Sequence, residues 1–286
     1  MNKVLISVAP VVATGETNYP ARISGRQILS MPHHERYKIH DPAKIAEDVI
    51  ACSKAGAAMV HLHVRDSEGK LTSNMAVFEE TVRLIRKESD IIIQASTGGI
   101  SNLTIQERCA PLYHPMVEAC SLNVGSTNLG QAVYLNPIGE VEYCVQEVLK
   151  NKKTPEVETF EIGHTHAAKE LMAKYPFNNP VLFSIVLGHK GEAPATPEAL
   201  TNMISMIPRE ALWGITHANR VDFSLIAAAL GLGASTVRIG FEDSKYLDSK
   251  TMADTNLELV EKTVRLVRAM DKEPLTPMEA RMKFNI

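Results

Sequence analysis

The stretch MVHLHVRD, residues 59–66, decides the fold. Its apolar residues predict a buried strand, and side chains alternate along a strand. His61, His63 and Arg65 therefore share one face, while the intervening leucine and valine face the other way. Polar residues that share the inward face near the carboxyl end of a strand are typical of barrel enzymes, whose active sites lie at that end.

Seven further runs of this kind occur along the chain. The eight runs are VLISVAPV (4–11), MVHLHVR (59–65), IIIQAST (91–97), CSLNVG (120–125), ETFEIG (158–163), VLFSIVLG (181–188), ALWGITH (211–217) and STVRIG (235–240). Helix-like segments separate them, such as residues 41–56, where Asp41 can cap the helix, Pro42 suits its first turn and Gly56 can end it.

This alternation predicts an α/β protein with a parallel sheet, closed as a (β/α)8 TIM barrel that forms one domain over residues 1–286. An open doubly wound sheet is the competing fold, because strand order cannot be read from the sequence. The connection GETNYPARISGRQILSMPHHERYKIH, residues 15–40, is long for a βα loop and predicts a lid or substrate loop.

The composition excludes several classes of protein. The chain has 286 residues, 45% of them apolar and 22% charged, with a formal net charge of -3, which gives no field that would attract nucleic acid. No apolar run reaches the roughly 18 residues that a membrane span needs. The four cysteines show no CxxC pairing and no disulfide framework, so we expect a cytoplasmic protein.

The H-x-H pair is a candidate metal site. Two imidazoles on one strand face suit zinc or a similar divalent ion, with a carboxylate as third ligand and an open position for substrate. Glu242 is the best third ligand, because the second and eighth strands of a barrel both flank the first. The competing interpretations are two hydrogen-bonded core histidines and an ordinary acidic loop in FED, residues 241–243.

Arg238 lies in an apolar run and must be paired to offset the cost of burying its charge. Glu158 and Asp243 are its candidate partners. Such a cluster either tunes Asp243 as a general base or braces the barrel interior.

Serine and glycine residues follow the third and fourth runs. In QASTGGI, residues 94–100, Gln94 and Ser96 share the inward phase, and the loop either cradles a carboxylate or phosphate or forms a plain tight turn. Ser121 and Asn123 share a phase in the next run. The second H-x-H, in GHTH (163–166), falls where a helix should begin, so its histidines would face different ways.

Together these motifs resemble the β-keto acid cleavage enzymes. The resemblance extends over almost the whole chain, and the motifs that carry it, in order, are AGAAMVHLHVRD, IIIQASTGG, CSLNVGSTN, PEVETFEIG, LGHKG, LWGI and VRIGFED. It implies a TIM barrel, usually a homotetramer, that uses a catalytic zinc to convert a β-keto acid and acetyl-CoA into acetoacetate and a new acyl-CoA.

The resemblance also implies roles for individual residues. It implies that His61, His63 and Glu242 bind zinc, that Asp243 with Arg238 and Glu158 is the acid–base group, and that Ser96 and Ser121 hold the substrate carboxylate. The serine and glycine loops themselves add Thr97, Gly98 and Asn123 as candidate substrate-binding residues. In family members that act on amino-bearing substrates, an acidic residue in the first loop contacts the substrate cation, and Glu16 is near that position. Departures from the family pattern at Gly163-His164, in THANR (216–220) and in GAS (233–235) concern the identity of the substrate.

Two other functions fit parts of the pattern. A metal-dependent amidohydrolase-like barrel hydrolase would use H-x-H with later histidines and Asp243, but it places H-x-H on the first strand rather than the second. A nonenzymatic metal-binding scaffold would give no reason for Arg238, Glu158, Ser96 and Ser121 to share the inward phase.

Overall fold

The computed structural model describes residues 3–12, 22–23, 26–27 and 40–286. Glu16 and most of the long first connection lie outside the described residues. In the described part of the chain, every helix is too short or too polar to cross a membrane.

Eight parallel strands close into a barrel, so the predicted (β/α)8 fold is confirmed. The strands are β1 (Lys3–Val8), β4 (Met59–Leu62), β5 (Ile92–Ala95), β6 (Ala119–Asn123), β9 (Thr154–Thr159), β10 (Leu182–Leu187), β11 (Leu212–His217) and β12 (Thr236–Ile239). Each pairs with the next, and β12 returns to pair with β1, with Arg238 opposite Ser7. An open doubly wound sheet would leave those two strands apart.

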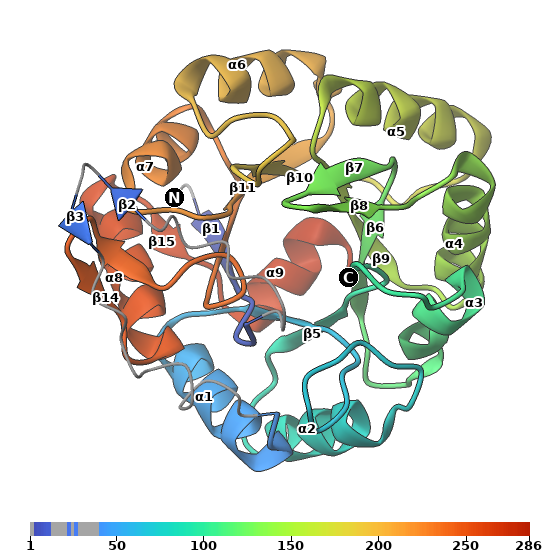
Figure 1. Ribbon diagram of the computed structural model, residues 1–286, viewed down its shortest axis with the longest axis horizontal. Helices are drawn as coiled ribbons and strands as arrows, with labels where there is room; N and C mark the ends of the chain where they lie inside the picture. Colours follow the sequence, from blue (N-terminus) through green and yellow to red (C-terminus); the bar gives the residue numbers. More distant parts are fainter. Residues whose placement is uncertain (1–2, 13–21, 24–25, 28–39) are drawn as a thin grey trace.

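Helices surround the barrel in chain order (Figure 1). They are α1 (Pro42–Ala55), α2 (Ala76–Arg86), α3 (Ile105–Arg108), α4 (Ile138–Lys150), α5 (Ile162–Lys174), α6 (Pro197–Met206), α7 (Ser224–Gly231), α8 (Asn256–Ala269) and, across the middle of the view, α9 (Pro277–Phe284). Helix α1 begins and ends as its sequence predicts, because the Asp41 side chain accepts a hydrogen bond from the Ala43 amide and Gly56 adopts a positive φ of 122°.

Two expectations were wrong in detail. The fifth strand covers Thr154–Thr159 and not residues 158–163, because helix α5 already begins at Ile162; inward Glu156 and Glu158 make this strand look polar in the sequence. The third strand is followed only by the four-residue α3 and the 3-10 helix η2 (Ala110–Tyr113) rather than by a full helix.

The described residues also form three short hairpins and one short strand outside the eight barrel strands. They are β2 (Arg22–Ile23) with β3 (Arg26–Gln27), β7 (Thr127–Leu129) with β8 (Ala132–Tyr134), β13 (Tyr246–Asp248) with β14 (Thr251–Met252), and β15 (Glu273–Pro274) beside β1. The hairpin β7–β8 follows a barrel strand at its carboxyl end, the end where barrel enzymes bind their substrates.

The barrel interior changes from apolar to polar along its axis. One buried cluster joins inward residues from the early part of the strands, such as Leu5, Met59 and Ile92, to Phe284 of α9. Helix α9 therefore closes the amino-terminal end of the barrel. The later inward positions carry His61, Gln94 and other polar groups, so polar side chains concentrate at the carboxyl end.

Candidate active site

A cavity of about 900 Å³ opens at the carboxyl ends of the strands. Its polar lining includes nine of the sequence-predicted site residues: His61, His63, Ser96, Gly98, Asn123, Glu158, Arg238, Glu242 and Asp243. Another part of the lining is apolar: Leu103, Leu129, Ala132, Phe160 and Val186. This volume lies in the range of about 300–1,000 Å³ that is usual for small-molecule sites, so the cavity can enclose a metabolite-sized substrate.

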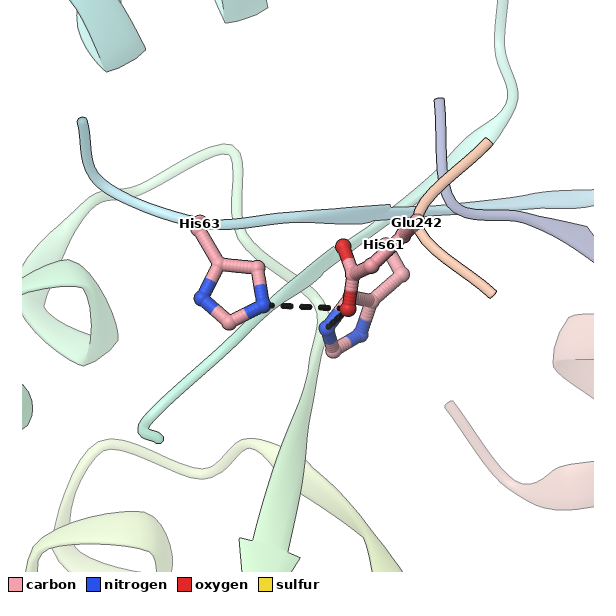
Figure 2. A group of neighbouring side chains, drawn as sticks. All are labelled: His61, His63 and Glu242. Carbon is pink, nitrogen blue, oxygen red and sulfur yellow. Dashed lines mark hydrogen bonds and ion pairs between the residues drawn. The ribbon is translucent and has the colours of Figure 1, made fainter. Parts of the chain in front are cut away.

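His61, His63 and Glu242 meet at one side of this cavity. Glu242 Oε1 lies 3.2 Å from His63 Nε2 and 3.7 Å from His61 Nε2. Figure 2 shows both rings directed at the same carboxylate oxygen. Strand order explains the meeting, because β1 lies between β4, which carries His61, and β12, which Glu242 follows.

The three side chains have the chemistry of a divalent-metal site. Burial lowers the pKa of His61, although the nearby Glu242 carboxylate opposes the shift, so the imidazole is neutral at pH 7. Burial acts to raise the pKa of Glu242, but its interactions with His63, His61 and Arg238 hold it well below its ordinary value. Two imidazole nitrogens and one carboxylate are a common ligand set for catalytic zinc.

Their spacing also fits one ion. The ligand atoms of the triad lie within 4.8 Å of one another, and no other group of histidine, cysteine, aspartate and glutamate in the described part of the chain meets that criterion. Nearby, the carboxyl groups of Glu158, Glu242 and Asp243 face the single guanidinium of Arg238. A bound cation would offset this local excess of acidic groups.

Arg238 links the triad to Asp243. Its Nε and Nη2 donate to the two oxygens of Asp243 at 3.1 and 2.6 Å, and Nη1 donates to Glu158 Oε1 at 3.0 Å. Nη2 also lies 3.6 Å from Glu242 Oε1. Burial acts to lower the pKa of Arg238, but the carboxylates of Asp243, Glu242 and Glu158 raise it above its ordinary value, so Arg238 carries a permanent charge inside the barrel.

The serine and threonine residues take different positions. Ser96 lines the cavity, and its Oγ accepts a hydrogen bond from the Gly98 amide at 3.2 Å, which leaves its hydroxyl proton available to a ligand. Ser121 Oγ lies 3.5 Å from Ser96 Oγ. Thr97 Oγ1 donates to the Ser121 carbonyl at 2.7 Å, and neither Thr97 nor Ser121 is among the described residues that line the cavity. They support Ser96 from behind.

Gly98 makes room for a tyrosine that the sequence did not point to. A Cβ atom at Gly98 would lie 1.7 Å from the Tyr134 hydroxyl, and 3.0 Å from Asn123 Nδ2. Tyr134 lies on β8 and reaches into the cavity wall, where Arg108 stacks 5.5 Å from its ring centre. Asn123 donates to Glu158 Oε2 at 2.9 Å, so the tyrosine, the glycine loop and the Arg238 cluster form one continuous wall.

Two further buried residues support the site from within the barrel. Gln94 contacts His61, and Glu156 contacts Gln94. The alternation of the third strand placed Gln94 inward. Glu156 precedes the run 158–163 in which the sequence placed the fifth strand, so that misplaced boundary hid it.

The other histidines do not join the triad. His189 lines the cavity, and Glu192 Oε1 accepts from its backbone amide and contacts its Nδ1, both at 2.9 Å. His164 lies in the first turn of α5, as expected, and its Nδ1 accepts from the Phe160 amide at 3.2 Å. His217, which a hydrolase of the amidohydrolase type would need, is not among the described lining residues.

Fold and site together define a (β/α)8 barrel enzyme with a candidate metal centre at the carboxyl ends of its strands. The sequence profile of the beta-keto acid cleavage enzymes matches residues 40–286. The chain belongs to this family.

Individual proteins show the same relationship. The 3-keto-5-aminohexanoate cleavage enzyme of Fusobacterium nucleatum is 34% identical over 258 residues, which cover 87% of this chain and 93% of that protein. The 3,5-dioxohexanoate:acetyl-CoA acetone transferase of Paraburkholderia graminis is 28% identical over 282 residues, covering 88% and 91%. The structure of ObcA in a ternary complex with a C4-CoA adduct and oxalate has the same fold, with a TM-score of 0.71 and 19% identity over 87% of this chain and 67% of that one.

Proposed function

We propose that the chain is a zinc-dependent β-keto acid:acetyl-CoA acyltransferase, which converts a β-keto acid and acetyl-CoA into acetoacetate and a new acyl-CoA. One observation carries the proposal: in a member of this family, His61, His63 and Glu242 meet within 4.8 Å beside the Arg238–Asp243 pair in one cavity. The name of the Paraburkholderia graminis relative supports acetyl-CoA as the second substrate.

The proposed reaction exchanges one carbon–carbon bond for another. The carboxymethyl carbon of the keto acid bonds to the acetyl carbonyl carbon, and its bond to the keto carbon breaks. The released acyl group leaves as a thioester of CoA, so no oxidant or reductant is needed. Zinc held by His61, His63 and Glu242 would act as a Lewis acid toward the ketone and as a template for the carboxylate.

The other assigned residues bind the substrate and move its proton. The Ser96 hydroxyl, whose oxygen already accepts from the Gly98 amide, donates to the substrate carboxylate. Asp243 takes the proton from the carboxymethyl carbon and returns it. Arg238 fixes the orientation of the Asp243 carboxylate through two hydrogen bonds, and its Nη1 donates to Glu158.

A coupled assay and a metal analysis test this proposal. The purified chain should contain about one zinc per subunit and release acetoacetate from at least one β-keto acid of a panel with neutral, anionic and cationic substituents, only when acetyl-CoA is present. Hydrolysis of amides or esters without acetyl-CoA would favour the amidohydrolase-like alternative instead. Failure of the whole panel with metal-loaded protein would count against the acyltransferase.

We also propose that the chain assembles as a homotetramer. Three apolar residues, Val133, Leu135 and Ile138, are 53%, 62% and 73% exposed along β8 and the start of α4, which suits a protein–protein contact. Light scattering should give four times the chain mass, and Leu135→Asp should lower that mass. A monomer at micromolar concentration would contradict the proposal.

A further inference from the structure

A line of hydrogen bonds runs away from the metal triad through the barrel interior. His61 Nδ1 lies 2.6 Å from Gln94 Oε1, and Gln94 Nε2 donates to Glu156 Oε2 at 2.5 Å. The three side chains are 2%, 0% and 5% exposed, so water does not compete for these contacts. The proposed reaction assigns no step to Gln94 or Glu156. Their contacts with His61, a proposed metal ligand, and with each other therefore need another explanation.

The strand register makes this line of contacts feasible. His61 of β4 pairs with Gln94 of β5, so the two side chains stand level on adjacent strands. Glu156 is on β9, two strands from β5, and Ala119 of the intervening β6 pairs with Gln94. Ala119 carries only a methyl group, and Gln94 contacts Glu156 across β6.

The chemistry of the amide fixes the proton on the histidine. At a pH where Glu156 is ionised, its carboxylate only accepts hydrogen bonds, so it turns the NH2 group of Gln94 toward itself and the amide oxygen toward His61. That oxygen also only accepts, so His61 must carry its proton on Nδ1. Its Nε2, 3.7 Å from Glu242 Oε1, then keeps a lone pair on the side where the triad meets.

The second histidine lacks this support. Within the described residues, His63 Nδ1 is buried and has no hydrogen-bond partner. The two imidazoles therefore differ: one is held in a single tautomer and ring orientation, and the other is not held through its Nδ1. Partners that orient a metal-ligating histidine commonly change metal affinity by about 10- to 100-fold when they are removed.

We propose that Gln94 and Glu156 are positioning residues that hold His61 as its Nδ1-protonated tautomer and thereby set the affinity of the metal centre. The proposal rests on the proposed function in one respect, that a divalent ion binds at the triad. It goes beyond it by assigning a role to two residues that touch neither the ion nor the substrate.

Zinc affinity measured by chelator competition tests this assignment, with Gln94→Leu as the disruptive variant. Leucine has a similar size but leaves His61 Nδ1 without an acceptor, so the dissociation constant should rise about 10- to 100-fold. The double variant Gln94→Glu with Glu156→Gln reverses the order of the groups: Glu at 94 accepts from both His61 and the new amide. It should recover most of the lost affinity.

Ser184→Ala is the matched control. Ser184 Oγ lies 3.0 Å from Thr216 Oγ1 in another buried pair inside the barrel, outside the proposed machinery. This variant should bind zinc as tightly as the unmodified chain. If it weakens binding as much as Gln94→Leu does, the effect is a general response to interior substitution and the proposal is wrong.

Nitrogen-15 NMR of the histidines in the metal-free protein gives an independent test. The His61 signals, assigned by comparison with His61→Ala, should report a proton on Nδ1, and Gln94→Leu should shift the population toward protonated Nε2. A proton on Nε2 in the unmodified chain would overturn the proposal. Zinc binding that survives His61→Ala would overturn the metal centre itself, whereas binding that needs His61 but ignores Gln94→Leu would overturn only the positioning role.

Discussion

Arg238 holds both oxygens of Asp243, with Nη2 2.6 Å from Oδ1 and Nε 3.1 Å from Oδ2. This two-point contact fixes the plane of the carboxylate as well as its position. The same guanidinium holds Glu158, so a single charge organises two buried acids. We therefore expect both stability and the proposed catalysis to depend on Arg238.

Replacing Arg238 with Met should destabilise the protein strongly. The variant leaves Asp243 and Glu158 buried without their cation, a loss that typically costs about 3–5 kcal/mol of the free energy of unfolding. Urea denaturation measures it. The control is Arg268→Met, because Arg268 pairs with Glu273 on the surface, with both side chains more than 40% exposed, and should contribute about 1 kcal/mol or less. Equal losses in the two variants would refute the interpretation.

Replacing His61 with Ala should remove bound zinc and turnover while the barrel stays folded. The buried apolar interior and the paired strands hold the fold, and the triad lies at the carboxyl end of the barrel. Metal content by atomic emission and secondary structure by circular dichroism check the two halves of this prediction. Full zinc content in the variant would remove His61 from the ligand set.

Replacing Asp243 with Asn should separate metal binding from proton transfer. Asn has nearly the same shape but cannot take up the substrate proton, so turnover should fall at least about 100-fold, the lower end for loss of a general base. Zinc content should remain unchanged because Glu242, not Asp243, belongs to the triad. An active Asn variant would exclude Asp243 as the base.

The sequence predicted the parts of the site that depend on strand phase and strand order. The alternation of side chains along a strand predicted that His61, His63 and Arg238 face the barrel interior. Closure of the barrel, which pairs β1 with both β4 and β12, places Glu242 beside the two histidines. The sequence could not predict contacts that depend on register between strands or on hairpin geometry. Tyr134 is such a case, because its hydroxyl reaches Gly98 only through the fold of β7–β8.

Glu156 escaped prediction for a different reason. Its strand, TPEVET, alternates two inward acids with small or apolar residues, so it lacks the apolar run by which the other strands were found. A carboxyl group inside a barrel is tolerated here because Gln94 donates to it. Polar interior positions of this kind weaken the signal that marks a buried strand.

Replacing Gly98 with Ala should distort the cavity wall. The new methyl group would lie 1.7 Å from the Tyr134 hydroxyl, so the tyrosine or the glycine loop must shift, at a cost of about 1–3 kcal/mol. Urea denaturation should show that adding Tyr134→Phe recovers part of this loss, since it removes the atom that clashes most. If the double variant is instead less stable by the sum of the single effects, the clash is not the cause.

The stability of the protein should depend on pH through Glu156. Burial raises the pKa of this carboxyl group to about 7 from an ordinary value of 4.5. Between those two values the folded state binds the proton more tightly than the unfolded state does. The stabilisation is therefore complete below about pH 4.5 and disappears as the pH rises through 7.

Comparison with Glu156→Gln isolates this contribution, because the glutamine cannot ionise while all other titrating groups are shared. The free energy of unfolding of the unmodified chain, minus that of the variant, should fall by up to about 3 kcal/mol from pH 5 to pH 8. Urea denaturation at several pH values of the metal-free protein measures the difference. A difference that is flat or rises with pH would show that Glu156 is ionised throughout, and that Gln94 compensates fully for its burial.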